Sequence, residues 1–324
     1  MNYKFNIPVV LIFFSRPDTF KQVFEKIRKQ KPEKLFLIQD GPREGNKNDS
    51  IKIQQCREIA ENIDWDCEVY KNYSDVNLGC GKRPSSGISW VFKYVDKAII
   101  LEDDCVPGNT FFPYCKELLK RYEHDERICY ISGLNHFKEW DCGESSYFFT
   151  KTGAIWGWAT WKRAWDKFDY YVKILNNEYT ARLVKKQISN RHISKTRYQA
   201  WVKANKSFQT GKKLSYWDVQ WGFVKYSENS LVIVPKYNQI HNIGIGKDST
   251  HSQSLKKSSF RKYKNFVFIP VRPLEFPLKH PLCCICDTDY DSLLYKCISG
   301  NPIRNFLAKY IKKLIGKAKT LWKV

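Results

Sequence analysis

The sequence predicts an α/β fold in which a central, mostly parallel mixed sheet is flanked by helices. Short apolar runs alternate with segments whose apolar residues recur at helical spacing, and charged side chains follow several of the runs. The chain has 324 residues, of which 43% are hydrophobic, so it can bury a substantial core. Strands that alternate with helices in this way are typical of parallel strands joined by helical crossovers.

The first strand and helix follow each other directly at the start of the chain. Residues 8–14 (PVVLIFF) form an apolar run, which we interpret as a strand. After Pro17, four apolar residues recur at helical spacing: Phe20, Val23, Phe24 and Ile27. Asp18 or Thr19 can cap this helix.

Three further strand and helix pairs repeat this pattern. KLFLIQDGPRE contains a strand that ends at Asp40, and IKIQQCREIAENI has the period of a helix. CEVYKNY is the third predicted strand and GISWVFKYV the helix after it. KAIILEDD is the fourth strand, followed by the helical segment TFFPYCKELLKRYEHD. In open α/β sheets ligands bind beyond the carboxyl ends of the strands, where Arg16, Asp40 and the acids of KAIILEDD fall.

The pattern changes at about residue 128. Shorter strand-like, aromatic segments follow, such as ICYISGL, SYFFTKT, IWGWATW and LVIVP. We interpret residues 1–270 as one domain with halves at about 1–127 and 128–270, followed by a Cys-containing connecting segment over 271–300. Residues 177–213 are rich in Lys, Arg, Asn and Gln, which predicts a helix-and-loop excursion on the surface.

The last segment, residues 301–324, is predicted to be a basic amphipathic helix. Apolar residues recur in it at helical spacing and lysines occupy most other positions, as in a helix that lies on an anionic membrane surface. The alternative is a helix packed on the domain. No apolar run approaches the ~20 residues that span a bilayer. These features predict a cytoplasmic protein, peripheral on the cytoplasmic face of the membrane.

The net charge limits the classes of binding partner, and the cysteine content indicates the redox state of the cellular compartment. The formal net charge of +22 indicates an anionic partner: nucleic acid, an acidic membrane or a phosphate-bearing small molecule. Eleven cysteines, an odd number, and the lack of a secretion signal favour a reducing compartment. Whether Cys283, Cys284, Cys286 and Cys297 bind a metal stays open, because their spacing contains no CxxC pair.

Three consecutive acids, Glu102, Asp103 and Asp104, end the buried run AIIL. Carboxylates at a strand end suit a hard divalent cation, Mn²⁺ or Mg²⁺, which also takes water and substrate phosphates as ligands. A diphosphate leaving group needs such a cation. The alternative is an exposed acidic turn without a ligand.

Two further segments contain candidate binding groups. In NLGCGKRPSS the residues Gly81, Lys82 and Arg83 precede a helix, where backbone N–H groups and cations favour anions. This segment is not a Walker A loop. The segment NIGIGKDSTHS ends near His251, which can bind a metal or a phosphate.

The segment SYWDVQWGF places Asp218 between Trp217 and Trp221. Desolvation by the indoles would strengthen Asp218 as a base, whereas the alternative is a core pair of tryptophans with a capping aspartate. Aromatic residues are 15% of the chain, and Trp158, Trp217 and Trp221 are candidates for stacking on sugar faces as well as for the core.

Six segments in this order resemble bacterial glycosyltransferases of the GT-A fold and, more distantly, eukaryotic N-acetylglucosaminyltransferase I. They are PVVLIFFSRPDTFKQVFEKIRKQKPEKLFLIQDGPRE, NLGCGKRPSSGISWVF, AIILEDDCVPGNTFFPYCKELL, TGAIWGWATWKRAWDKF, WDVQW and GIGKDSTHS. The resemblance covers about residues 7–255. It implies a Rossmann-like fold whose first half binds the donor and whose second half binds the acceptor.

The resemblance also implies roles for individual residues. The acidic triplet matches a DXD-type motif, in which Asp104 binds the metal while Glu102 and Asp103 face sugar and ribose hydroxyls. Asp218 matches the catalytic base, and His251 lies on a loop over the diphosphate. The remaining matches are donor-binding: Arg16 in the nucleotide loop, Asp40 at the uracil ring, and Gly81, Lys82 and Arg83 along the pocket.

These matches imply a metal-dependent, inverting transfer from a nucleotide-sugar donor, UDP-linked by resemblance, to a saccharide or lipid-linked acceptor. Cell-surface polysaccharide or lipooligosaccharide synthesis is the expected setting. A basic nucleic-acid-binding protein is an alternative, but it leaves the acidic triplet unexplained, so we expect no nucleic-acid partner. A catalytically inactive sugar-binding relative is the other alternative.

Overall fold

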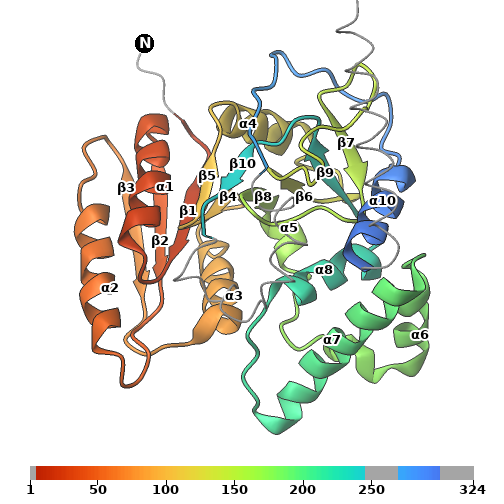
Figure 1. The fold of residues 1–324 in the computed structure, drawn as a ribbon, viewed down its shortest axis with the longest axis horizontal. Helices are drawn as coiled ribbons and strands as arrows, with labels where there is room; N and C mark the ends of the chain where they lie inside the picture. Colours follow the sequence, from red (N-terminus) through yellow and green to blue (C-terminus); the bar gives the residue numbers. More distant parts are fainter. Residues whose placement is uncertain (1–4, 245–268, 300–324) are drawn as a thin grey trace, which may run out of the picture.

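The computed structural model describes residues 5–244 and 269–299. An eight-stranded mixed sheet forms its centre, in the order β3-β2-β1-β4-β8-β6-β9-β7, and helices pack on both faces (Figure 1). Four of its seven strand pairings are parallel. A second sheet pairs β10 (Ile240–Asn242) with β5 (Cys105–Pro107). The predicted α/β fold class is confirmed.

The first half has the four predicted parallel strands. They are β1 (Val9–Phe13), β2 (Lys34–Gln39), β3 (Glu68–Tyr73) and β4 (Lys97–Glu102). Between them lie α1 (Pro17–Gln30), α2 (Lys47–Ala60) and α3 (Gly79–Val91), and α4 (Phe111–Arg121) follows β5. Every residue of β1 is buried, because alternate side chains enter cores on opposite faces of the sheet.

The two faces are covered by different helices. One core contains the apolar sides of α1, α2 and α4, together with alternate residues of the strands such as Leu11 and Leu37. The opposite core contains the apolar side of α3 and the other residues of the same strands, such as Val10 and Ile38. The apolar sides of the helices and the alternate side chains of the strands therefore form three layers, with the sheet between two layers of helices.

The second half extends the same sheet with mixed pairing. Its strands are β6 (Ile128–Ser132), β7 (Tyr147–Thr150), β8 (Trp158–Trp161) and β9 (Leu231–Pro235). β8 pairs antiparallel with both β4 and β6, and thereby joins the two halves into one continuous sheet. The helices α5 (Lys162–Trp165) and α8 (Asp218–Ser227) contribute to the same core as α3.

The basic segment 177–213 forms a helical unit to one side of the sheet (Figure 1). It contains α6 (Glu178–Lys186) and α7 (Arg191–Thr210), preceded by the short η1 (Lys173–Asn176). A third core lies inside this unit, with Trp201 fully buried against Phe223 and Tyr226 of α8.

Helix α10 (Thr288–Ser299) packs on the domain through a buried carboxylate. Asp291 accepts hydrogen bonds from the hydroxyls of Thr150 and Thr152 and from the backbone N–H of Lys151. Tyr290 of the same helix is fully buried. The predicted tail helix, residues 301–324, lies outside the described residues. Among the helices that are described, none is long and apolar enough to cross a membrane.

Candidate functional site

The carboxyl ends of three neighbouring parallel strands meet at one edge of the sheet. β1 lies between β2 and β4, and Ile12 is in register with Glu102. The segments that leave these strands carry Arg16, Asp40 and Asp104. The side chains that the sequence placed at separate strand ends therefore belong to one region of the fold.

Arg16 joins the two aspartates of the acidic triplet. Its Nη1 donates to Oδ2 of Asp104 at 2.9 Å, and its Nη2 and Nε donate to the carboxylate of Asp103. Asp103 is only 2% exposed and also accepts from the backbone N–H of Phe14 at 3.3 Å. Burial alone would lower the pKa of Arg16, but the charges of both aspartates raise it, so the guanidinium stays charged. The expectation that Asp103 faces sugar hydroxyls is wrong, because Arg16 and the backbone occupy its oxygens.

Glu102 and Asp104 are the carboxylates that remain for a cation. Within the described part of the chain, the half-buried Glu102 side chain has no hydrogen-bond or ion-pair partner. Burial, and then the charges of Asp104 and Asp103, raise the pKa of Glu102 to about 8. Among the described residues, Oδ1 of Asp104 accepts a hydrogen bond from the thiol of Cys105 alone, at 3.3 Å. With a pKa of about 8, Glu102 is mostly protonated at neutral pH, and a divalent cation that binds it would displace this proton.

The donor set fits an open Mn²⁺ or Mg²⁺ site. Proteins commonly hold Mg²⁺ through one or two carboxylates and leave its other positions to water and substrate phosphates. Glu102 and Asp104 supply such oxygens. Over residues 5–244 and 269–299, no three His, Cys, Asp or Glu side chains gather closely enough to enclose a metal.

Asp40 caps α3, which begins inside the glycine segment, so Gly81, Lys82 and Arg83 lie within this helix and not before it as predicted. Its Oδ1 accepts from the backbone N–H of Leu78 at 2.8 Å, and its Oδ2 accepts from that of Gly79 at 2.8 Å. The N–H of Gly41 adds a third bond at 3.0 Å. Asp40 is 6% exposed, so its observed role is to hold the N-terminus of α3 beside β2. A direct contact with a nucleobase stays a prediction.

Arg83 is a structural cation and does not line an open pocket. It is 5% exposed, and its Nε donates to the carbonyl of Gln39 at 3.0 Å. Its Nη2 donates to Asn72, so the side chain joins the ends of β2 and β3. The predicted donor contact of Arg83 is therefore wrong. Lys82, the preceding residue, is exposed and stays a candidate.

Gly81 allows α3 to approach the segment before α8. A Cβ atom at this position would lie 2.2 Å from the carbonyl oxygen of Leu214 and 2.8 Å from the hydroxyl of Tyr170. The neighbouring thiol of Cys80 donates to the carbonyl of Ser215 at 3.0 Å. The absence of a side chain at Gly81 thus permits the contact between the two halves of the domain.

The pKa of Cys80 depends on acidic side chains from three different elements. Its pKa is raised by burial and then by the charges of Glu102, Asp40 and Asp218. The charge of Asp218 also raises the pKa of Glu102. Acids from β4, from the end of β2 and from the start of α8 are therefore within electrostatic reach of one another. Sequence reasoning did not single out Cys80, although it lies in the quoted glycine segment.

Asp218 is the first residue of α8 and is exposed. The expected desolvation by its tryptophan neighbours is wrong. Trp217 and Trp221 instead form a core pair, with the carboxylate outside it, as in the alternative interpretation of this segment. An exposed carboxylate at a helix N-terminus is accessible to an acceptor from solvent.

The tryptophans predicted to stack on an acceptor belong to the core. Trp158 and Trp221 have no exposed surface, and Trp217 is 4% exposed. Their rings pack on one another and on Trp165, with the Trp158 and Trp221 centroids 5.7 Å apart. A sugar has no free indole face to contact, so the acceptor-binding role predicted for these three residues is wrong.

The second metal candidate, His251, lies outside the described residues. Before it, the described chain reaches Gly244 next to the acidic triplet. A Cβ on Gly244 would meet Oδ2 of Asp104 at 2.0 Å, and the N–H of Ile243 donates to the carbonyl of Asp104 at 2.9 Å. A side chain at position 244 would therefore displace the Asp104 carboxylate.

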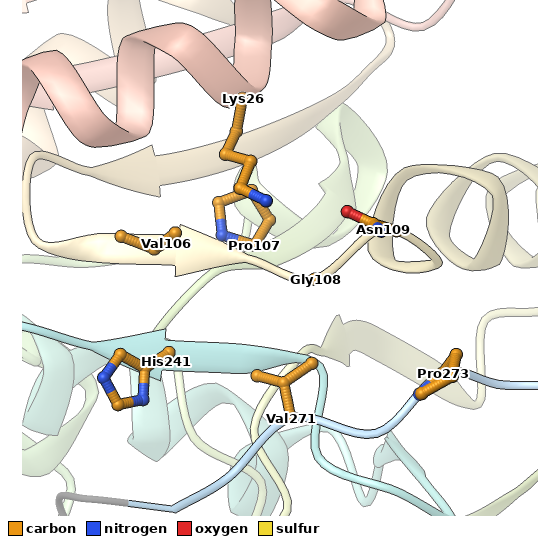
Figure 2. Close-up of a pocket in the computed structure, with 8 residues that line it drawn as sticks. All are labelled: Lys26, Val106, Pro107, Gly108, Asn109, His241, Val271 and Pro273. Carbon is orange, nitrogen blue, oxygen red and sulfur yellow. The ribbon is translucent and has the colours of Figure 1, made fainter.

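A cavity of about 350 Å³ lies on the α1 side of the small β5/β10 sheet (Figure 2). Lys26 of α1 extends toward Pro107, and His241 of β10 lies across the cavity from it. None of the lining residues is acidic, and none is a sequence-predicted site residue. This cavity is therefore separate from the acidic cluster.

Comparison with known proteins gives weak structural matches only. No protein-family model and no curated protein matches the chain. A UDP-glucose pyrophosphorylase complexed with UDP-glucose is 9% identical at a TM-score of 0.36, covering 72% of this chain and 91% of its own. HddC from Yersinia pseudotuberculosis is 12% identical at a TM-score of 0.29, and the match covers 48% of this chain and 77% of HddC. 4-Diphosphocytidyl-2C-methyl-D-erythritol synthase from Anaerococcus prevotii is 10% identical at a TM-score of 0.31, and the match covers 72% of this chain and 91% of the synthase. Likeness of this size concerns the chain trace and not the activity.

Proposed function

We propose that the chain is a glycosyltransferase that moves a sugar from a nucleotide diphosphate donor to a hydroxyl of a saccharide or lipid-linked acceptor, with inversion. The observation that carries the proposal is that Glu102 and Asp104 lie at the end of β4 while α3 joins this edge to the segment before Asp218, through the Cys80–Ser215 hydrogen bond and the close approach at Gly81. It joins a cation-binding pair of carboxylates to a separate, exposed carboxylate from another element. A transfer that displaces a diphosphate requires these two kinds of group.

Different residues of the chain accept the proton and bind the donor. Asp218 takes the proton from the acceptor hydroxyl as that oxygen attacks the anomeric carbon. Glu102 and Asp104 present oxygens toward the donor diphosphate, and Asp103 fixes Arg16 beside them. One base and one in-line displacement produce inversion of the anomeric centre.

A bound Mn²⁺ or Mg²⁺ would offset the negative charge of the departing nucleoside diphosphate. The guanidinium of Arg16 supplies a further fixed positive charge at Asp104, 2.9 Å from Oδ2. Arg16 also keeps the two aspartates from repelling each other before the donor arrives. UDP as the nucleotide, and action at the cytoplasmic membrane face through residues 301–324, are parts of the same proposal.

The test is calorimetric titration of the whole chain with UDP, GDP, CDP and their sugar conjugates, with and without Mn²⁺. We expect one nucleotide to bind in a Mn²⁺-dependent manner and the D104A variant to lose this binding. D166A is the matched control, because Asp166 is exposed and bonded only to Lys162 of its own helix end. If no nucleotide binds under any metal condition, the proposal is wrong.

A further inference from the structure

A second cavity, of about 380 Å³, lies along α7 and the segment that follows it. Three exposed lysines line it, Lys203 and Lys206 from successive turns of α7 and Lys212 after the helix end. The other lining residues are uncharged: Gln199, Val202, Ser207, Thr210 and Leu214. Three ammonium groups around one cavity, with no carboxylate among its lining residues, favour an anion.

The cavity belongs to a strongly basic unit. Residues 177–213 contain ten Lys and Arg side chains and a single acid, Glu178. Among the described residues, none of these ten cations forms an ion pair with a carboxylate. Elsewhere, surface cations such as Lys97 and Lys279 do pair with acids. The charge of this unit is therefore not neutralised within the described fold.

The cavity borders the candidate functional site. Leu214 lines the cavity, and its carbonyl oxygen is the atom that a Cβ on Gly81 would meet at 2.2 Å. The next residue, Ser215, accepts the hydrogen bond of the Cys80 thiol. Asp218 follows three residues later. One short segment thus forms a wall of the cavity and leads to the proposed base.

We propose that the lysine cavity binds the phosphate or diphosphate group of the acceptor while the acceptor hydroxyl reaches Asp218. This inference rests on the proposed function, because only the proposed transfer makes the bound phosphate part of an acceptor. The binding of a phosphate by the cavity does not depend on any transfer. The acceptor class is accordingly a phosphate-bearing saccharide rather than a neutral sugar.

The first experiment measures inorganic pyrophosphate binding to the whole chain by calorimetry in metal-free buffer, because pyrophosphate itself binds Mn²⁺ and the proposed donor site requires the metal. The variant K203Q/K206Q/K212Q removes the cavity cations. The control K185Q/K186Q/K195Q removes the same charge from exposed positions of the same unit. Each set includes one lysine over a tyrosine ring, Lys203 over Tyr216 and Lys185 over Tyr198.

We expect the cavity variant to lose at least about tenfold in pyrophosphate affinity, and the control to lose about twofold or less. Equal losses in both variants would mean diffuse attraction and would overturn the proposal, as would undetectable binding to the wild type at millimolar pyrophosphate. Circular dichroism confirms that both variants are folded. Because no acceptor or transfer is needed, a failed donor titration leaves this result interpretable.

A membrane surface is the competing occupant. Vesicles of phosphatidylcholine with and without 30% phosphatidylserine, assayed by sedimentation, distinguish it. Serine-lipid-dependent binding that both triple variants weaken equally, together with no pyrophosphate binding, would identify the unit as a membrane-binding face and overturn the cavity proposal. Pyrophosphate binding lost in the cavity variant alone supports it.

Discussion

Asp218 and Lys225 lie two turns apart on α8 in opposite environments. Asp218 is exposed at the first residue of the helix, whereas Lys225 is 2% exposed. Position within the fold, and not the local sequence, decides which of them meets solvent. Each leads to a prediction about one side chain.

The D218N variant removes the proposed base without changing the size of the side chain. We expect the transfer rate to fall by about 10²–10⁴-fold, because the amide cannot accept the acceptor proton. Nucleotide affinity should change by less than about twofold, since Asp218 is proposed to act on the acceptor hydroxyl and not to bind the nucleotide. D289N, an exposed acid at the start of α10, is the control. Undiminished transfer by D218N would exclude Asp218 as the base.

Lys225 is expected to cost stability near neutral pH. Burial, with the charge of Arg197 acting in the same direction, lowers the pKa of Lys225 to about 7, and its Nζ has only a 3.4 Å contact with the hydroxyl of Tyr130. Between pH 7 and the unfolded value of 10.5, the unfolded chain binds one more proton than the folded chain. The Lys225 contribution to the free energy of unfolding therefore rises with pH, by roughly 1.4 kcal/mol per unit in this window.

Urea denaturation of the wild type and K225M at several pH values tests this. We expect K225M to be more stable at pH 7, and its advantage to shrink as the pH rises toward 10. The control K186M, at an exposed position of α6, should show no such trend. A difference between wild type and K225M that stays constant with pH would contradict a depressed lysine pKa.

At the scale of elements, α3 is the helix through which the two halves of the domain meet at the candidate site. Its N-terminus is capped by Asp40, and its second and third residues contact the segment before α8. The site geometry therefore depends on helix docking as much as on the acidic side chains.

The G81A variant tests this docking. Its Cβ would lie 2.2 Å from the Leu214 carbonyl, a backbone atom that cannot move aside without shifting the segment toward Asp218. We expect the free energy of unfolding to fall by about 1–3 kcal/mol and the transfer rate to fall with it. S86A, exposed on the same helix, should remain within about 0.5 kcal/mol of wild type. Wild-type stability and activity in G81A would show that the close approach is dispensable.

At the scale of the whole molecule, Cys80 is a reporter for donor binding between the two halves. The residue is exposed, whereas its thiol is partly shielded, donates to the carbonyl of Ser215 and lies within electrostatic reach of Glu102, Asp40 and Asp218. The raised pKa of Cys80 makes its alkylation slow at neutral pH, so that protection by a ligand can be followed over time.

We expect Mn²⁺ together with the binding nucleotide, at about ten times its Kd, to slow N-ethylmaleimide modification of Cys80 by about tenfold. Cys283, exposed in the segment before α10, serves as the internal control and should react at an unchanged rate. Peptide mass spectrometry gives both rates from one sample. Equal rates at Cys80 with and without nucleotide would place donor binding elsewhere on the molecule.

Local patterns were sufficient for most of the fold. Strand and helix periods depend on which side chains of one segment share a face, so PVVLIFF and the helix after Pro17 could be identified without knowledge of their neighbours. The placement of acids at strand ends also followed, because a parallel sheet brings those ends to one edge.

Local patterns in the chain were therefore enough to predict the α/β class, the order of the elements in the first half and the edge of the sheet at which the acids lie. Long-range packing, in contrast, places Trp158, Trp217 and Trp221 in the core, buries Arg83 and pairs Asp103 with Arg16. It also brought three lysines of the basic segment around one cavity beside α8. The physical reason is that burial and pairing depend on residues distant in the chain, which no local period can specify.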